Sequence, residues 1–346
     1  MRLGLILGYS GKSIVLPFAL IEQAEQLGFD SIWTAEAYGS DAVTVASWIL
    51  ARTQRLRVGT AIMQIPARTP AMCAMTAMSL AQLSGGRFIL GLGASGPQVV
   101  EGWHGQPYAK PLSRSREYIA IVRQIMAREQ TVCFNGEHYQ LPYQGEGSLG
   151  LGRPLKSILS AAPDIPIYMA SITPAGLRLA AEVADGVFPV WMDPKRFDLL
   201  APHLDAGFAK AGGGKNLSNF DVAPFVSVSM GDGLEQCRAP LREHLALYIG
   251  GMGAKGKNFY YDYTVALGYE EAAHRIQELY LAGKKQAAAA AVPAELMDAV
   301  ALLGPKERIK ARLEVWKQAG HRNYVGSMLI RTHQPEVMSL LADELL

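Results

Sequence analysis

The chain of 346 residues contains only three cysteines, and they lie far apart in the sequence. Cys73, Cys133 and Cys237 form no CxxC pair, which argues against a disulfide framework or a zinc-binding spacing. No uninterrupted apolar segment approaches the roughly 20 residues that span a bilayer. The N-terminus also lacks the sustained apolar run and cleavage site of a signal peptide. These features predict a reduced, cytoplasmic protein that does not enter a membrane.

Charge of one sign is also scarce, because 33 Lys and Arg residues oppose 31 Asp and Glu residues. The basic residues are spread along the chain, so no nucleic-acid partner is predicted. The seven histidines show no HExxH or HxH spacing, and the acidic residues show no EF-hand spacing. We therefore predict no metal. The absence of GxSxG argues against a serine hydrolase.

What the sequence does contain is a regular alternation of apolar strand-like runs and helical patterns, in a chain that is 49% hydrophobic. Eight such units predict an α/β fold, a closed (β/α)8 TIM barrel formed by a single domain over residues 1–346. Two segments interrupt the alternation. Residues 131–154 contain an Asn-Gly turn between short β-type runs, which predicts an inserted hairpin. Residues 231–320 are mainly helical and predict a second insertion. The predicted strands cover residues 3–7, 31–36, 56–63, 88–92, 166–171, 186–191, 222–230 and 324–331.

The catalytic groups of such barrels lie at the carboxyl ends of the strands. This rule selects positions close to the predicted strand ends, and these are Tyr9, Glu36, Thr60 to Gln64, Gly93 to His104, Ser171, Trp191, Ser229 and Arg331.

Residues 87–105, RFILGLGASGPQVVEGWHG, are expected to form one wall of the site. A buried strand ends in small residues that let a planar ligand approach the backbone, and an open loop is predicted from Pro97 onward. Glu101 and His104 in that loop are candidates for general acid or base, or are simply solvated. Residues 91–96 match GxGxxG, but the predicted loop after them argues against a dinucleotide-binding Rossmann unit.

Three other features carry two interpretations each. Ser171 and Thr173 precede a predicted helix, where they either cradle an anion or serve as ordinary N-caps. Glu36 is either a ligand-binding group or a capping and salt-bridge partner. The loop of residues 250–257, with Lys255 and Lys257, either closes over an anionic cofactor tail or is mobile surface.

Four motifs together resemble one known superfamily. WTAEAYGSD, RVGTAIMQIPARTP, LSGGRFILGLGASGPQVVEGWHG and AAEVADGVFP are similar to segments of the luciferase-like flavin and deazaflavin oxidoreductases. The chain most resembles the actinobacterial branch that uses coenzyme F420 and is related to methylenetetrahydromethanopterin reductase. The resemblance implies a bacterial luciferase-like barrel, a deazaflavin at the strand carboxyl ends, and a homodimer packed through barrel helices. It also implies a cis peptide between Ala61 and Ile62, in a bulge that backs the central ring.

The cofactor-binding residues implied by this resemblance follow the predicted strands two to six. Residues 170–173 would bind the cofactor phosphate, and Glu36 corresponds to an acid that contacts the cofactor side chain. The complete set is Glu36, Thr60, Ala61, Ile62, Gly93, Ala94, Ser95, Ala170, Ser171, Ile172, Thr173 and Trp191.

The chain departs from the alcohol and sugar-phosphate dehydrogenases of this superfamily at two positions. Their histidine after the strand-two acid is replaced by Ala37, and their glutamate after the strand-four glycines is absent. Glu101 or His104 could replace these groups, or a reductase could take its proton from another donor or from water. We therefore predict hydride transfer between the deazaflavin C5 and an unidentified small organic substrate. The alternatives are an FMN-dependent monooxygenase or flavin reductase, and a non-catalytic F420-binding or flavin-binding protein.

Overall fold

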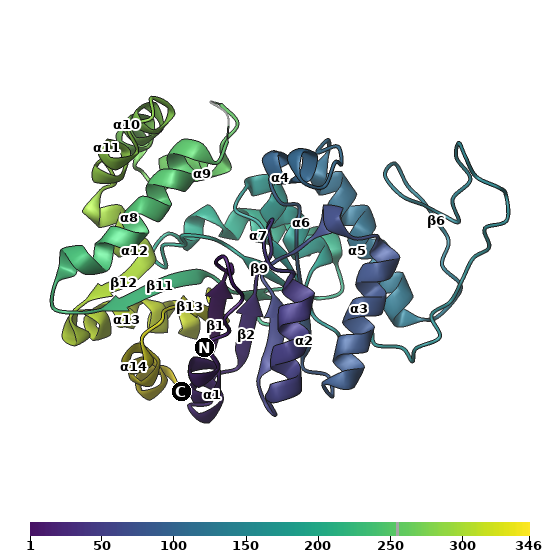
Figure 1. Cartoon of the computed structure of the whole chain (residues 1–346), viewed down its shortest axis with the longest axis horizontal. Coiled ribbons are helices and arrows are strands. Elements are labelled where there is room, and N and C mark those ends of the chain that lie inside the picture. Colours follow the sequence, from purple (N-terminus) through teal and green to yellow (C-terminus); the bar gives the residue numbers. More distant parts are fainter. Residues whose placement is uncertain (254–255) are drawn as a thin grey trace.

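The computed structural model describes residues 1–253 and 256–346 and has one curled parallel sheet, with helices packed around its outer face (Figure 1). The sheet order is β10, β9, β8, β5, β3, β2, β1, β13, β11 and β12, and the short strand β4 pairs with β5. The strands are β1 (Arg2–Gly8), β2 (Ser31–Thr34), β3 (Arg57–Thr60), β4 (Met63–Gln64), β5 (Phe88–Gly93), β8 (Ile167–Ala170), β9 (Gly186–Phe188), β10 (Asp221–Val222), β11 (Phe225–Met230), β12 (Ala301–Gly304) and β13 (Ser327–Arg331).

The helices follow the strands as the alternating pattern predicts. Two of them begin at N-termini capped by a side chain: Asp41 accepts a hydrogen bond from the Thr44 N–H, and Thr69 accepts one from the Met72 N–H. The helices that alternate with the strands are α1 (Phe18–Gln26), α2 (Ala42–Arg52), α3 (Pro70–Leu83), α4 (Pro97–Gly102), α5 (Pro111–Ala127), α6 (Pro174–Val183), α7 (Ala201–Ala211), α13 (Lys306–His321) and α14 (Pro335–Leu345), with short 3-10 turns at Ile65–Ala67 and Phe197–Leu199.

The predicted hairpin in residues 131–154 is confirmed. Strands β6 (Phe134–Asn135) and β7 (Gln140–Leu141) pair antiparallel, and their segment projects from the body of the molecule beyond α3 and α5 (Figure 1).

Residues 231–320 are mainly helical, as predicted, but they also contain a strand that was not predicted. The helices are α8 (Leu234–Gly251), α9 (Phe259–Ala266), α10 (Glu270–Leu281), α11 (Lys285–Ala290) and α12 (Ala294–Val300). Strand β12 then pairs with β11, with Ser227 opposite Ala301, so this segment adds an edge strand to the sheet. Lys255, on which the predicted closure of residues 250–257 partly depended, lies outside the described residues.

Two further predictions are corrected. The open loop expected after Pro97 is the short helix α4, because proline fits the first position of a helix, where its missing N–H costs nothing. The predicted seventh strand is divided into β10 and β11 at Ala223 and Pro224, since Pro224 has no N–H to offer a neighbouring strand.

A small aromatic core fills the concave side of the sheet. Trp33, only 1% exposed, lies 5.1 Å from the ring of Phe188, which in turn lies 5.4 Å from Tyr168. A Cβ atom at Gly59 would be 2.2 Å from the Trp33 ring, so the neighbouring strand must have glycine there. Within residues 1–253 and 256–346, no helix combines the length and apolar character of a bilayer crossing.

Candidate active site

The predicted cofactor residues gather at one edge because neighbouring strands run parallel and their carboxyl ends meet there. Short hydrogen bonds fix these ends to one another. The Ala61 N–H donates to the Thr34 carbonyl at 2.6 Å, joining the third and second strands. The Thr60 hydroxyl donates to the Gly91 carbonyl at 2.7 Å and accepts from the Gly91 N–H at 3.0 Å. Thr60 therefore ties β3 to β5 through its side chain, a role that the sequence did not indicate.

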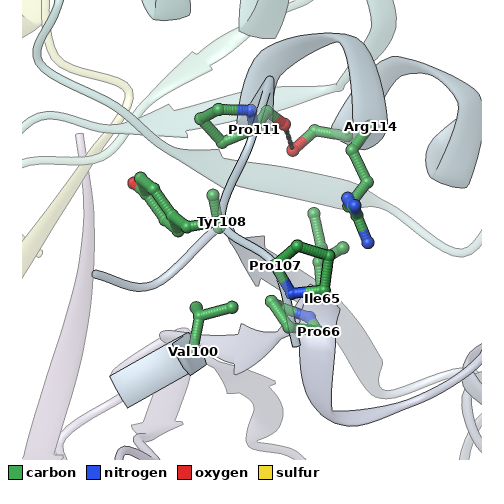
Figure 2. Close-up of a pocket in the computed structure, with 9 residues that line it drawn as sticks. Ile65, Pro66, Val100, Pro107, Tyr108, Pro111 and Arg114 are labelled. Atoms are coloured by element: carbon green, nitrogen blue, oxygen red, sulfur yellow. Dashed lines mark hydrogen bonds between the residues drawn. The ribbon is translucent and has the colours of Figure 1, made fainter. Parts of the chain in front are cut away.

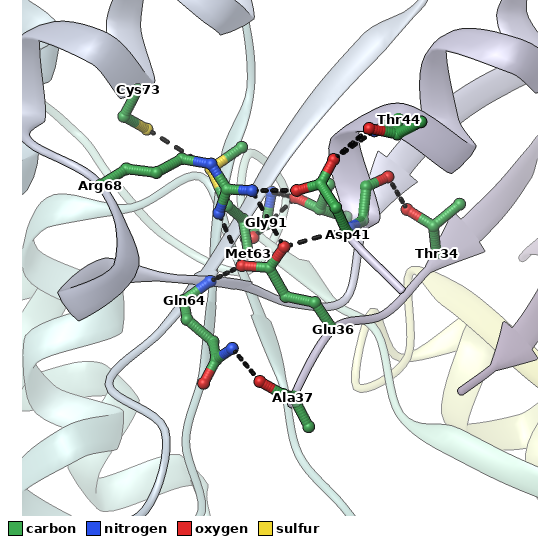
Figure 3. A network of polar contacts seen from close by, with 12 residues as sticks. Thr34, Glu36, Ala37, Asp41, Thr44, Met63, Gln64, Arg68, Cys73 and Gly91 are labelled. Carbon is green, nitrogen blue, oxygen red and sulfur yellow. Dashed lines mark hydrogen bonds and ion pairs between the residues drawn. The ribbon is translucent and has the colours of Figure 1, made fainter. Parts of the chain in front are cut away.

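Glu36, two residues beyond β2, forms the centre of a buried polar network (Figure 3). Its carboxylate accepts from the Ala42 N–H at 3.0 Å, the Gln64 N–H at 2.8 Å, and both terminal nitrogens of Arg68 at 2.7 and 3.1 Å. Of the two interpretations of Glu36, capping and ion pairing are confirmed. Its contact with a cofactor remains a prediction.

Arg68 holds two carboxylates, because its guanidinium also pairs with Asp41, the N-cap residue of α2 (Figure 3). Burial disfavours the charged guanidinium, but its hydrogen bonds and Coulomb attraction to Glu36 and Asp41 outweigh burial and raise the pKa of Arg68. Burial likewise opposes ionisation of Asp41, yet the hydrogen bonds from Thr44 and the charge of Arg68 lower the pKa of Asp41. Both groups are therefore held in their charged forms.

The side-chain amide of Gln64 is buried at this edge, and the residue is only 2% exposed. Its Nε2 donates to the Ala37 carbonyl at 2.8 Å, whereas its Oε1 has no hydrogen-bond partner among the described residues. A buried acceptor without a partner costs free energy unless a ligand or water satisfies it. Gln64 was included only as the end of a strand, and nothing in the sequence distinguished its free acceptor.

The peptide bond between Ala61 and Ile62 is cis, as the resemblance implied. Ile62 lies against β5, where a Cβ atom at Gly93 would be 2.8 Å from the Ile62 side chain. At Gly91 the added Cβ would be 1.7 Å from the Thr60 carbonyl oxygen. The adjoining strand therefore requires glycine at the first position of the GxGxxG match, whether or not a ligand approaches there.

The segment after β5 turns back over the strand end through Ser95, whose φ of 61° is left-handed. The Tyr108 hydroxyl donates to the Ser95 carbonyl at 3.1 Å, and Tyr108 also lines a small pocket with Ile65, Pro66 and Ala94 (Figure 2). This contact holds the loop of residues 94–96 near the bulge that follows β3.

Glu101 and His104, the predicted acid and base, differ in their surroundings. Glu101 is exposed, and its carboxylate accepts from the Tyr108 N–H at 3.3 Å. His104 follows α4 and is partly buried, and its Nε2 has no hydrogen-bond partner among the described residues. His104 thus has a buried ring nitrogen without a partner among the described residues, while Glu101 faces solvent.

Thr173 caps α6 at the end of β8, and its hydroxyl accepts from the Gly176 N–H at 3.1 Å. Ordinary N-capping is therefore confirmed. Anion binding by residues 170–173 remains a prediction, and it is compatible with this geometry because the positive end of a ten-residue helix points toward the edge.

An aromatic cluster completes the edge on its other side, and sequence analysis missed most of it. Trp191, beyond β9, lies 5.2 Å from Tyr260, 5.9 Å from Tyr248 and 6.1 Å from His244, measured between ring centroids. His244 and Tyr248 are four residues apart on α8, a spacing that places them on one helix face. That spacing was the available signal, but nothing in the sequence connected α8 with Trp191.

Comparison with known proteins gives a consistent set of similarities. The family model of luciferase-like monooxygenases matches residues 17–323. A protein of Mycobacterium tuberculosis, provisionally named a coenzyme F420-dependent oxidoreductase, is 44% identical over 92% of this chain and 93% of its own.

Solved structures show a similar fold over nearly the whole chain. Coenzyme F420 dependent tetrahydromethanopterin reductase from Methanopyrus kandleri superimposes with a TM-score of 0.77 and 22% identity, over 99% of this chain and 97% of its own. An F420-dependent secondary alcohol dehydrogenase, in complex with an F420-acetone adduct, superimposes with a TM-score of 0.75 and 18% identity, over 99% and 98% of the chains.

Proposed function

Because the chain belongs to the luciferase-like monooxygenase family, we propose that it is an oxidoreductase that transfers a hydride between coenzyme F420 and a small organic substrate. One observation carries the proposal: residues from five neighbouring strands converge on an edge where the buried Gln64 acceptor has no partner among the described residues. When bound, the reduced deazaflavin supplies the hydride.

The residues at this edge fit such a cofactor in two parts. The ring would lie against Ala61 and Ile62 on one side and against Gly93, Ala94 and Ser95 beyond it. A buried acceptor such as Gln64 Oε1 suits a ring N–H. For this chain we propose that Glu36 and Thr60 act indirectly, because their polar atoms already hold Arg68, Gln64 and the backbone of β5.

The cofactor tail would extend toward α6. Residues 170–173 and the N-terminus of α6 offer N–H groups and a positive dipole end to a phosphate. Trp191 would close the opposite side with an aromatic face. Glu101 and His104 stay candidates for the acid or base, with His104 favoured because its Nε2 is buried and lacks a partner among the described residues.

We also propose that the curled sheet closes into an eight-stranded barrel as one domain over residues 1–346, with insertions at 131–154 and 231–320. Asp221 of β10 supports closure. It accepts from Arg2 of β1 at 2.7 Å, from Ser327 of β13 at 2.6 Å, and from the Tyr168 hydroxyl of β8 at 2.7 Å. One side chain thus links β10 and β8, near one end of the sheet order, to β1 and β13, which lie four or more places further along it.

A cytoplasmic homodimer is the final part of the proposal. Three free thiols agree with a reducing compartment. Helices α2 and α3 expose large apolar side chains that a second copy could cover, including Trp48 at 59% and Leu83 at 86% exposure. Sedimentation analysis should give twice the chain mass of 37.4 kDa, and Trp48→Glu combined with Leu83→Glu should give the single-chain mass. A wild-type protein that sediments as a single chain would contradict this part.

The test of the cofactor is a parallel fluorescence titration of the purified protein with coenzyme F420 and with FMN. We expect saturable binding of F420 and weaker binding of FMN. Gln64→Leu should weaken F420 binding about fivefold, since one buried hydrogen bond contributes about 1 kcal/mol, and Gln144→Leu, at an exposed glutamine, should not. Preference for FMN would indicate flavin chemistry, and binding of neither would refute the proposal.

A further inference from the structure

The aromatic cluster around Trp191 contains titratable side chains, which a simple apolar wall against a cofactor would not need. His244 and Tyr248 come from α8, and Tyr260 comes from α9, both within the inserted segment. The Tyr248 ring lies 4.4 Å from His244 and 4.8 Å from Tyr260, between centroids. The Tyr248 phenol therefore contacts both an imidazole and a second phenol at the carboxyl end of β9.

Two groups at the ends of β1 and β13 act on Tyr248. Tyr9 follows β1, and Arg331 is the last residue of β13. Tyr9 is 62% exposed and Arg331 is also exposed, whereas Tyr248 is partly buried. The cluster thus connects solvent, through Tyr9, to a partly buried phenol above the strand ends. The predicted cofactor residues occupy the same edge, at β2, β3, β5 and β8.

The charges around the cluster indicate which group can give a proton. Burial and the positive charge of Arg331 lower the pKa of His244 to about 4, so its imidazole is neutral at pH 7. Burial, reinforced by the phenols of Tyr9 and Tyr260, raises the pKa of Tyr248, and Arg331 opposes that shift. Burial and the phenols of Tyr9 and Tyr108 raise the pKa of Tyr260 to about 12. The phenols hold their protons near neutrality, and among the described phenols of the cluster Tyr248 is the one whose pKa both the exposed Tyr9 and the cationic Arg331 influence.

We propose that Tyr248 is the proton donor of the reaction and that the substrate is a carbonyl compound, either a ketone or aldehyde or an α,β-unsaturated ketone. This inference rests on the proposed function. Tyr248 then takes the acid role for which Glu101 and His104 were the candidates, and it supplies the proton source that the missing dehydrogenase histidine and glutamate leave open. A tyrosine at this place also matches the aromatic surroundings, which favour a planar, weakly polar acceptor.

The step balances as follows for a saturated carbonyl. The substrate carbon gains the hydride, the C=O π pair moves to oxygen, and that oxygen takes the proton of the Tyr248 O–H. An alkoxide is more basic than a phenolate, so this transfer is downhill even from a phenol of raised pKa. Arg331 stabilises the phenolate, which regains a proton from solvent through Tyr9. The proton that leaves the cofactor ring nitrogen on oxidation goes to solvent. In an α,β-unsaturated ketone the β carbon gains the hydride, the C=C π pair moves to the α carbon, and that carbon takes the proton of the Tyr248 O–H.

The first test measures hydrogen bonding to a carbonyl without turnover. 4-(Dimethylamino)cinnamaldehyde absorbs at longer wavelength when its carbonyl oxygen accepts a strong hydrogen bond. Mixed with protein and oxidised F420, the wild type should shift this band to longer wavelength. Tyr248→Phe should remove the shift, and Tyr261→Phe, one residue beyond Tyr260 on α9, should keep it. An unchanged band in the wild type, or the same shift in Tyr248→Phe, would overturn the inference.

The second test measures reduction of cyclohex-2-en-1-one by reduced F420. Tyr248→Phe should lower kcat at least 100-fold, the lower range for general-acid catalysis. The KM for F420 and the melting temperature should stay near their wild-type values. A wild type that binds F420 but reduces neither this enone nor the aldehyde would refute the inference and leave the cofactor assignment standing. Failure to bind F420 in the separate titration would remove both.

Discussion

Replacing Arg68 by methionine should destabilise the protein through the buried carboxylate that it leaves behind. The Glu36 side chain is 6% exposed and the Arg68 side chain 18%. Arg68→Met keeps the aliphatic stem but removes two hydrogen bonds to Glu36 and the pairing with Asp41. Breaking a fully buried pair costs about 3 to 5 kcal/mol. Asp41 regains water because it is 39% exposed, so we expect about 3 kcal/mol.

The expected change in melting temperature follows from the size of the chain. An unfolding entropy of about 2.1 cal/mol/K per residue gives roughly 0.7 kcal/mol/K for 346 residues. A loss of about 3 kcal/mol therefore lowers the melting temperature by about 4 °C, measured by circular dichroism. The double variant Glu36→Gln with Arg68→Met should recover at least half of this loss, since the uncompensated charge is gone.

The matched control is Arg153→Met, at an exposed arginine, which should shift the melting temperature by less than about 1 °C. If Arg68→Met behaves like Arg153→Met, the network does not stabilise the edge as argued. If the double variant melts below the single variant, the loss came from packing and not from a buried charge.

Three further perturbations test separate parts of the structure. Gly91→Ala should prevent accumulation of folded protein in expression trials, because its Cβ would be 1.7 Å from the Thr60 carbonyl oxygen. The control Gly102→Ala, whose added Cβ has no neighbour within 4 Å, should fold normally. Equal yields of folded protein from the two variants would contradict this reasoning. Thr173→Ala should cost about 1 kcal/mol and weaken F420 binding in the titration, and Thr173→Ser should restore both. The pKa of His244 is about 4 when folded and about 6.5 when unfolded, so the unfolded chain binds more protons between these values and stability falls as pH decreases across that window. His244→Gln should flatten the decrease in melting temperature between pH 6.5 and 4, and an unchanged profile would refute the assignment.

The alternation of strands and helices could be predicted because a buried strand is a short, continuous run of apolar residues and glycine. In β5 all six residues are buried, and the run is apolar or glycine throughout. Strand β12 is not separated in sequence from the helix that precedes it. Leu296, Met297 and Val300 continue a helical pattern directly into Ala301, and three apolar residues followed by a glycine do not distinguish a strand from another helical turn. Its pairing with β11 is decided by tertiary contact, not by its own residues.

For the candidate site, the sequence indicated which strand ends lie together but not the contacts between them. Parallel topology placed Glu36, Gly93 and Trp191 at strand ends. The cis peptide after Ala61 came from resemblance alone, since neither Ala61 nor Ile62 carries a local signal for it. The ion pair of Arg68 with Glu36 joins residues 32 positions apart in the sequence, and the contact of Trp191 with His244 of α8 joins residues more than 50 positions apart. Such pairings depend on packing that no local pattern encodes.

Strand β12 couples the local unfolding of the inserted helices to that of the sheet. Hydrogen bonds along residues 301–304 attach the end of the insertion to β11, which itself pairs with β13. A segment held only at its two ends could open as an independent cooperative unit while the sheet stayed closed. Here the opening of α8 to α12 would pull on an edge strand. Slow amide exchange in β12 should therefore track that of β11, and the proton-donor face on α8 gains the rigidity of the sheet.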